Sequence, residues 1–538
     1  MVQSLTPHAL RALLASEAPH ALLDVRELGE YNSAHIPGAS AVPRRLLEFR
    51  LPRLVPCRHT QLVVYDDDGR RARLAAATLE RMGYTQVAVL EGGLKRWASL
   101  GYRTEWGVNV PSKDFGEKVQ VQYQVPEMHP EALWARLQRG ETLVILDART
   151  PEEHRRATIP GSRSLPGGEL ALRIAEVVPT ADTPIVVHCA GRTRSLVGAR
   201  LLQRMGFPHV YALRNGTMGW ALAGLALEEG STRFDLPAPS PAGLAAAERF
   251  AERVAAEDGV QRLGVAELQA LMARRTQENI YLIDVRTAEE FAQGHIPGFW
   301  WVPGGQAVQR ADDVVAVRRG HVVFACDGRV RALVTASWYR QLGFPHVYAV
   351  DGGTRAWQQA GLPLAQGGPE SLGAGYDAGL DAMPWGFAEA RARVTCLTAT
   401  ALQEHLQRTP TAHILFVGTS REFSRAHLPG ARWLLRSWLE LDLPAVAPDK
   451  ATPLVLTCAD GYQAVLAAAT LEALGYRQVV VLDGGMQAWQ QAGLPVEQGL
   501  SGVMAPPNDV LPMGTERSWA EAIHYLQWEE DLGAKYHR

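Results

Sequence analysis

One pattern of residues occurs four times along the 538-residue chain, and this repetition limits the fold more than any other feature. The four stretches read LVVYDDDGRRARLAAATLERMGY at 62–84, IVVHCAGRTRSLVGARLLQRMGF at 185–207, VVFACDGRVRALVTASWYRQLGF at 322–344 and LVLTCADGYQAVLAAATLEALGY at 454–476. One position in this pattern is held by Asp66, Cys189, Cys326 and Cys458. The chain is therefore expected to contain four copies of a single structural unit.

Further motifs keep the same register around that position. A strand-end motif lies 42 residues upstream: Asp24-Val25-Arg26, Asp147-Ala148-Arg149, Asp284-Val285-Arg286 and, altered, Phe416-Val417-Gly418. A Pro-Gly turn follows, opened by His35, Thr158, His295 or His427. A glycine 27 residues downstream precedes Trp97, Trp220, Trp357 or Trp489, which we interpret as core residues because they occur in every copy.

Local patterns give the order of elements within one copy. Short β-branched runs predict strands, and Thr150 with Glu153 and Thr287 with Glu290 match the capping box that opens a helix. Strands that alternate with helices predict an α/β fold, with a parallel sheet covered by helices on both faces. The repeated loop that contains Asp66, Cys189, Cys326 or Cys458 then lies at the carboxyl ends of the strands, where ligands bind in such sheets.

The pattern predicts four domains at 1–105, 125–230, 258–366 and 393–498, followed by a tail at 499–538. Between them we expect a polar, irregular linker at 106–124, a proline-rich joint at 237–241 before a helix, and a glycine-rich linker at 366–388. The middle joint suggests two halves of two domains each. The tail contains three aromatic residues, Trp519, Tyr525 and Trp528. They favour a helix that packs on a domain, and a tail that binds a partner is the alternative.

The loop around Cys189 has the chemistry of a reactive cysteine. Cys189 follows a buried strand and precedes a helix, and Arg192 and Arg194 lie beside it. Helix N-termini and neighbouring cations both favour the thiolate over the thiol. The alternative is a structural cysteine at a strand end, which needs neither the glycine nor the arginines of this loop.

Composition limits the class of protein and the cellular compartment that are expected. The net charge of −3 argues against a dedicated nucleic-acid or membrane-surface protein, and no apolar run reaches the length of a membrane span, so a cytoplasmic protein is expected. The five cysteines are an odd number without close pairing, which favours reduced thiols over disulfides or a metal site. No cofactor is expected. Cys57 and Cys396 have no counterpart in other copies and are interpreted as bystanders.

Together, the loop, the Asp-x-Arg strand end, the His-Ile-Pro-Gly turn and the Gly-Gly-x-x-x-Trp element resemble the rhodanese family of sulfurtransferases, repeated four times. The resemblance covers the chain apart from its linkers and tail. It implies a flavodoxin-like or Rossmann-like unit and a cysteine that carries sulfane sulfur as a persulfide. Thiosulfate or a related small molecule would be the donor, and cyanide, a small thiol or a protein would be the acceptor.

The copies differ in how much of the site they keep. Catalysis is expected at Cys189 and Cys326, with Arg192, Arg194, Arg329 and Arg331 as donor-binding residues. Two strand-end pairs are interpreted as loop supports: Asp147 with Arg149 and Asp284 with Arg286. Asp66 makes the first copy a structural or docking unit. Cys458 marks a degenerate site, because Tyr462 and Gln463 replace its arginines.

Three other functions fit the pattern less well. A cysteine phosphatase or arsenate reductase places its arginine six residues after the cysteine, whereas Arg194 and Arg331 lie five residues after theirs. The loop of the family's mercaptopyruvate enzymes, Cys-Gly-Ser/Thr-Gly-Val-Thr, matches neither copy. A persulfide carrier that delivers sulfur to a partner protein remains an alternative, because two of the four copies are altered.

Overall fold

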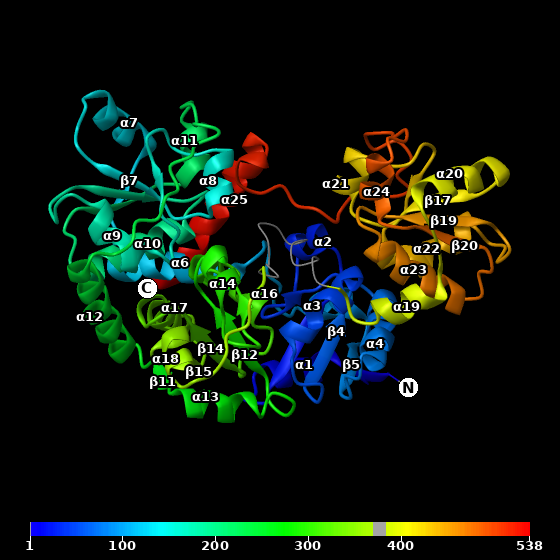
Figure 1. The fold of residues 1–538 in the computed structure, drawn as a ribbon, viewed down its shortest axis with the longest axis horizontal. Coiled ribbons are helices and arrows are strands. Elements are labelled where there is room, and N and C mark those ends of the chain that lie inside the picture. The colour runs from blue at the N-terminus through cyan, green and yellow to red at the C-terminus, as the bar shows by residue number, and fades with distance from the viewer. Residues whose placement is uncertain (1, 369–382, 538) are drawn as a thin grey trace. The chain divides into compact units, whose positions relative to one another are not determined.

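The computed structural model describes residues 2–368 and 383–537, and each of the four repeats forms its own sheet of five parallel strands (Figure 1). The strand orders are β1-β5-β4-β2-β3, β6-β10-β9-β7-β8, β11-β15-β14-β12-β13 and β16-β20-β19-β17-β18, so the same topology occurs four times. Helices lie on both faces of each sheet. The predicted fold class is confirmed.

The elements of the first two repeats have the following bounds. The first contains β1 (Gln3–Leu5), α1 (Pro7–Leu14), β2 (His20–Asp24), α2 (Leu28–Ser33), β3 (Ser40–Ala41), η1 (Arg44–Leu46), α3 (Leu47–Leu54), β4 (Gln61–Tyr65), α4 (Arg70–Arg81), β5 (Val87–Leu90) and α5 (Gly93–Ser99). The second contains β6 (Glu127–Met128), α7 (Pro130–Gln138), β7 (Val144–Asp147), α8 (Pro151–Arg156), β8 (Arg163–Ser164), α9 (Leu170–Val177), β9 (Ile185–His188), α10 (Thr193–Met205), β10 (Val210–Leu213) and α11 (Gly216–Leu222).

The last two repeats follow the same plan. The third contains β11 (Gln261–Leu263), α13 (Val265–Met272), β12 (Ile280–Asp284), α14 (Ala288–Gln293), β13 (Trp300–Trp301), α15 (Gly304–Gln309), α16 (Ala311–Val314), β14 (His321–Ala325), α17 (Val330–Gln341), β15 (His346–Val350) and α18 (Gly353–Gln359). The fourth contains β16 (Thr395–Leu397), α20 (Ala399–Arg408), β17 (His413–Phe416), α21 (Ser420–Arg425), β18 (Arg432–Trp433), η2 (Arg436–Trp438), α22 (Leu439–Val446), β19 (Leu454–Thr457), α23 (Tyr462–Ala473), β20 (Val479–Leu482) and α24 (Gly485–Gln491).

The capping boxes and the tryptophans behave as predicted. Thr150 caps α8 and Thr287 caps α14, each through its hydroxyl and the glutamate three residues on. The four repeated tryptophans are buried, at 0 to 6% exposure. The histidines that open three of the Pro-Gly turns hydrogen-bond to a carbonyl four residues earlier, which supports their interpretation as turn residues.

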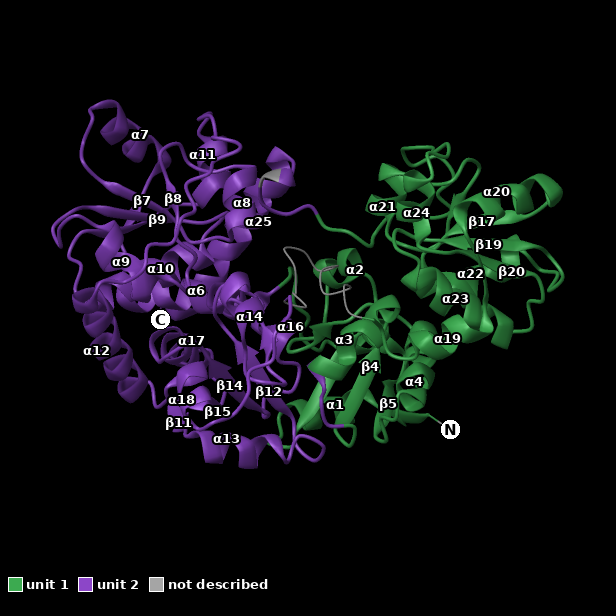
Figure 2. Ribbon diagram, in the orientation of Figure 1, with its two compact units in different colours: residues 1–53, 58–108, 382–511 green, residues 54–57, 109–381, 512–538 purple. Residues whose placement is uncertain are grey.

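The repeats pair differently from the sequence-based prediction. The chain divides into one unit of residues 1–53, 58–108 and 382–511 and another of residues 54–57, 109–381 and 512–538 (Figure 2). The first repeat therefore pairs with the fourth and the second with the third, so the prediction of two sequential halves is wrong. The proline-rich joint leads into α12 (Pro241–Glu257), capped by Ser240, and this helix packs on α9 and α17. It joins the second and third repeats instead of separating two halves.

Each pair uses equivalent positions of its two members. In the first unit, Arg44 of η1 pairs with Glu440 of α22, and reciprocally Arg436 of η2 pairs with Glu48 of α3. In the second unit, Gly167 and Gly304 occupy the places of Arg44 and Arg436, and the backbone of Gly304 closely approaches that of Gly168, the neighbour of Gly167. Ion pairs therefore link the first and fourth repeats, whereas glycines without side chains let the backbones of the second and third repeats come close together.

This close approach gives a stability prediction. A Cβ at Gly168 would lie 3.1 Å from three backbone atoms of Gly304 and Gly305, whereas a Cβ at Gly167 meets nothing nearer than 3.8 Å. We expect Gly168→Ala to lower the free energy of unfolding of this unit by about 1–3 kcal/mol. Gly167→Ala is the matched control, with a change expected within about 0.5 kcal/mol. Urea unfolding of both variants checks this, and equal losses would contradict the contact.

The linker predicted to be irregular at 106–124 is a helix, α6 (Val110–Tyr123). The prediction is wrong because α6 buries charged residues, including Lys113 and Glu117, which leaves no apolar stripe for sequence analysis to detect. The glycine-rich linker falls mainly in residues 369–382, outside the described residues; α19 (Phe387–Arg393) follows it.

The tail contains the predicted helix. It comprises η3 (Gly514–Glu516), α25 (Trp519–Gly533) and η4 (Ala534–Tyr536), and α25 packs on α6 within the second unit. Leu526 is buried there while Trp519 remains 62% exposed. Across the described parts of the chain, none of the helices combines the length and the apolar character that a bilayer crossing needs.

Candidate active site

The repeated loop lies at the carboxyl end of the central strand of each sheet. In the second repeat, Cys189 follows β9 and α10 begins at Thr193. Gly216 fits here because it adopts a φ of 54° and a Cβ would collide with the Cys189 carbonyl oxygen. The backbone N–H of Thr217 donates to that same oxygen, at 2.9 Å. The glycine found in all four copies therefore fixes the base of the loop.

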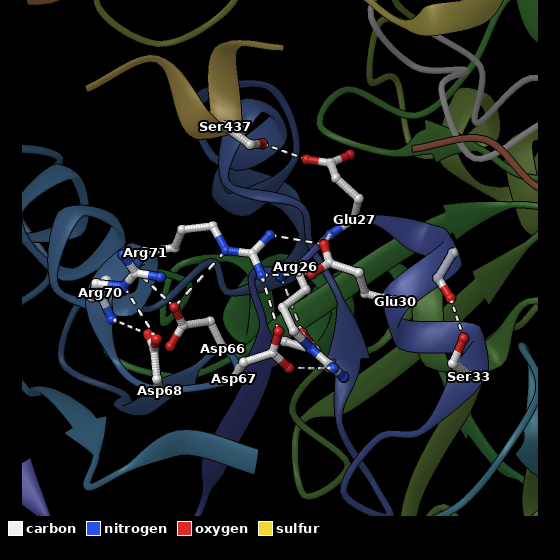
Figure 3. A network of polar contacts seen from close by, with 12 residues as sticks. Arg26, Glu27, Glu30, Ser33, Asp66, Asp67, Asp68, Arg70, Arg71 and Ser437 are labelled. Carbon is white, nitrogen blue, oxygen red and sulfur yellow. Dashed lines mark hydrogen bonds and ion pairs between the residues drawn. The ribbon is translucent and has the colours of Figure 1, made fainter. Parts of the chain in front are cut away.

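The first repeat shows what the loop binds. The Asp66 carboxylate accepts hydrogen bonds from the backbone N–H groups of Gly69, at 2.5 Å, and Arg71, at 2.8 Å. Figure 3 shows Asp66 beside Arg71. In the fourth repeat, the N–H of Gly461 points in the same way to Cys458 Sγ, at 3.2 Å. The loop is thus a cradle of backbone donors for a negatively charged atom. In the first repeat a built-in carboxylate occupies that cradle.

Cys189 borders a cavity of about 120 Å³ in the second unit. Its side chain is 2% exposed, and its Sγ lies 3.6 Å from Ser195 Oγ. The lining residues outside the loop carry mostly polar or charged groups; they include Lys113, Arg149, Glu153, Arg156, Gln309, Arg517, Tyr525 and Glu529. A small anion is the kind of ligand that these surroundings favour.

The two loop arginines of this repeat are already paired with carboxylates. Arg192 donates to Glu117 at 2.6 Å and to Glu127 at 2.8 Å. Arg194 makes two hydrogen bonds to Glu153, the capping-box glutamate of α8. These carboxylates raise the pKa of both guanidinium groups, against the opposing effect of burial. Both arginines border the cavity, and their roles in donor binding remain predictions.

The Asp-x-Arg pair supports the strand end more than the loop itself. Arg149 donates from its backbone N–H and its guanidinium to Asp147, and it also reaches the Ala157 carbonyl at 2.6 Å. The carboxylate further contacts His154 and accepts a hydrogen bond from Thr158, the threonine that replaces histidine in this copy. In the third repeat, Arg286 contacts Asp284 and the Gly294 carbonyl in the same way. The pair ties a strand to the end of the following helix.

The structure places Cys326 in less favourable surroundings than Cys189. Burial, followed by the charge of Asp327, raises the pKa of Cys326 to about 11, and the thiol is fully buried. Arg331 is bound by Glu290, Asp327 and Glu169, the last from the second repeat. Arg329 lies toward solvent and pairs with Glu252 and Asp351. Catalysis at Cys326 remains a prediction, and a smaller contribution is now expected.

Cys458 keeps the cradle but lacks the cations. Burial and then Asp460 raise the pKa of this thiol well above its ordinary value. Gln463 bonds to Arg436 and to the Arg45 carbonyl of the first repeat, so the position of the missing arginine serves the pairing of repeats. Cys57 is buried against the Gln277 carbonyl, consistent with a bystander.

Sequence reasoning missed two parts of the site. One is the glutamate that holds the second loop arginine: Glu30 with Arg71, Glu153 with Arg194 and Glu290 with Arg331, each pair 41 residues apart. That constant spacing was a usable signal. The other part comes from outside the repeats, as Lys113 of α6 and Arg517, Tyr525 and Glu529 of the tail, and no repeated motif marks them.

Known proteins resemble both the chain and its repeats. The family model described as Rhodanese-like domain matches residues 6–100, 129–223, 265–360 and 398–492. A solved structure of a thiosulfate sulfurtransferase from Pseudomonas aeruginosa is 38% identical, with a TM-score of 0.89, and the match covers 100% of this chain and 98% of that one. A thiosulfate sulfurtransferase of Azotobacter vinelandii is 27% identical over 244 residues, 38% of this chain and 88% of the relative. A sulfurtransferase of Allochromatium vinosum is 33% identical over 101 residues, 19% of this chain and 92% of the relative.

Proposed function

The chain belongs to the rhodanese-like family of sulfurtransferases, and from that premise we propose that it moves sulfane sulfur from thiosulfate or a related donor to a small thiol or cyanide through a persulfide on Cys189. The observation that carries this proposal is the position of Cys189, at the edge of a cation-lined cavity and beside a backbone cradle. The relatives named as thiosulfate sulfurtransferases support the choice of donor.

The reaction has two steps at one sulfur atom. The Cys189 thiolate attacks the outer sulfur of thiosulfate, the sulfur–sulfur bond of the donor breaks, and sulfite leaves with its electron pair. The persulfide anion that remains accepts hydrogen bonds from the loop N–H groups, as the Asp66 carboxylate does in the first repeat. The thiolate of the acceptor, or cyanide, then attacks the outer sulfur and releases the Cys189 thiolate.

Low exposure of Cys189 favours a small acceptor over a protein acceptor. Cys189 is 2% exposed at a cavity of about 120 Å³, a size that suits a small molecule better than a segment of a partner protein. The persulfide carrier alternative predicts a stable persulfide with weak turnover on small acceptors, whereas the proposed enzyme discharges its persulfide rapidly when cyanide is added.

Intact mass measurement tests the covalent step. After incubation with thiosulfate alone, the protein should gain ~32 Da, the mass of one sulfur atom, on Cys189. Cyanide should remove that mass and yield thiocyanate. Cys57→Ser is the matched control, because this buried thiol lies outside the loops and the variant should load normally. A sulfur adduct that persists in Cys189→Ser and maps elsewhere would contradict the proposal.

A further inference from the structure

Most of the arginines around the cavity beside Cys189 are already paired with carboxylates. Arg149 is paired with Asp147, Arg192 with Glu117 and Glu127, and Arg194 with Glu153. Arg156 lies toward solvent and meets Glu516, at 3.4 Å. Each of these arginines already has an anionic partner, so binding a sulfonate with any of them means competing with a carboxylate.

Arg517 differs from the other arginines of this cavity. Over residues 2–368 and 383–537, no carboxylate lies within ion-pair distance of its guanidinium. The group instead stacks on the Tyr525 ring, 4.2 Å from the ring centroid, and it borders the cavity with Cys189. Its position is fixed from both sides, because η3 precedes it and the capping box of Ser518 and Glu521 starts α25 directly after it.

Lys113 adds a second positive charge on the same aromatic residue. Its Nζ lies 5.3 Å from the Tyr525 ring centroid and 5.5 Å from that of Trp528. Burial lowers the pKa of Lys113 to about 8, so the amine is still mostly protonated at neutral pH. Two cations therefore lie against the Tyr525 ring at the cavity, Arg517 from the tail and Lys113 from α6.

The remaining acidic group of the cavity, Glu529, lies near both cations, and its charge and that of Asp312 partly offset the charge of Lys113. Glu529 is 2% exposed and accepts a hydrogen bond from the Tyr525 hydroxyl through one oxygen, while its other oxygen has no hydrogen-bond partner among the described residues. Burial raises the pKa of this carboxyl, which favours its neutral form when an anion enters. A sulfonate that binds at Arg517 would thus meet a carboxyl able to take up a proton.

We propose that Arg517, with Lys113 beside it, binds the sulfonate end of the sulfur donor and selects donors of the thiosulfate or thiosulfonate class for Cys189. This inference rests on the proposed function, since it assigns the donor of that reaction to residues outside the four repeats. Sulfite, the leaving group, gains charge as the sulfur–sulfur bond breaks, and a guanidinium at this position stabilises it.

Steady-state kinetics with two substitutions test the assignment. Arg517→Ala should raise the KM for thiosulfate about 10- to 100-fold, because a charged hydrogen-bond donor to the anion is lost. Arg517→Lys should recover part of that loss, since it restores the charge without the planar fork. Arg155→Ala is the matched control: it removes an arginine of the same unit that stacks on Phe234 and does not border this cavity. An unchanged KM in Arg517→Ala would overturn the proposal.

Alkylation of Cys189 gives a second readout that needs no turnover. Iodoacetate carries a negative charge and iodoacetamide does not, so the ratio of their rates at Cys189, followed by peptide mass mapping, reports an anion site near the thiol. Arg517→Ala should lower that ratio about tenfold, and because both rates are measured on one sample, a partly misfolded fraction does not mimic the effect. A ratio unchanged from wild type would overturn the proposal.

The two readouts separate this inference from the proposed function. If wild-type protein neither loads nor turns over thiosulfate, the proposed function fails. The alkylation ratio would in that case still decide whether Arg517 forms an anion site beside Cys189. If wild type turns over thiosulfate and Arg517→Ala leaves both KM and the alkylation ratio unchanged, the donor assignment fails alone.

Discussion

Replacing Cys189 with serine is expected to lower thiosulfate:cyanide sulfurtransferase activity by about 10³-fold or more, because a hydroxyl cannot replace a thiolate in attack on sulfur. Cys326→Ser should retain most of the activity. With its pKa at about 11, Cys326 is a thiolate in only about one molecule in 10⁴ at pH 7. Initial rates of the two single variants and the double variant measure how much of the activity each cysteine contributes.

The pH dependence of the residual activity distinguishes the two cysteines further. Any turnover left in Cys189→Ser should rise about tenfold per pH unit between pH 7 and 10, because the fraction of Cys326 thiolate increases until the pH reaches its raised pKa. Cys458→Ser serves as the control and should change little. Equal losses in Cys189→Ser and Cys326→Ser at pH 7 would show that the third repeat works as well as the second.

Replacing Asp147 with alanine is expected to destabilise the second unit by about 3–5 kcal/mol, since it leaves the buried Arg149 without its counter-ion. Asp235→Ala is the matched control. This aspartate is 81% exposed and pairs with Arg163 at the surface of the same unit, so its loss should cost at most about 1 kcal/mol. Denaturant unfolding of the two variants measures the difference.

Acid should narrow the gap between wild type and Asp147→Ala. The pKa of Asp147 lies well below its ordinary value: burial raises it, but the interactions with His188 and Arg149 and the hydrogen bonds from His154 and Arg149 lower it more strongly. A depressed pKa in the folded state stabilises the protein above the unfolded-state pKa of about 4, and that contribution is lost as the pH falls below this value. If the difference in the free energy of unfolding between wild type and Asp147→Ala stays constant from pH 6 to pH 3, the depressed pKa of Asp147 is contradicted.

The sequence was sufficient to predict the four sheets and the position of the repeated loop in each, because these rest on local signals. β-branched strands, the capping boxes at Thr150 and Thr287, and a glycine at each loop base repeat in a fixed register. Such signals depend on neighbouring residues and on one close backbone contact, so they are readable in a single chain.

The pairing of repeats was not predictable in this way. The contacts that decide it are Arg44 with Glu440 in one unit and Gly168 with Gly304 in the other, and neither pair carries a distinctive spacing. A proline-rich joint looks like a boundary in sequence, although here it opens a helix that joins two repeats. The direction of a chain after a joint depends on which surfaces fit, and single-sequence patterns do not record that fit.

The non-repeated part of the site escaped detection for a different reason. Lys113 and Glu117 are charged residues on a helix, which sequence patterns assign to solvent, yet both are buried by groups of opposite charge. Arg517 lies in a short turn before a helix whose residues resemble an ordinary surface tail. Charged residues that become buried through one another are visible only once the elements are placed in space.

The helix that borders the Cys189 cavity is synthesised long after the loop that it contacts. Arg192 of the loop and Glu530 of α25 are 338 residues apart in the chain. At translation rates of about 5–20 residues per second, the ribosome completes this wall some 15–70 seconds after the loop has been made. During that interval the nascent second repeat carries a thiol without its tail-derived neighbours, open to oxidants and to larger reaction partners. Synthesis of α25 therefore completes the wall of the cavity beside Cys189.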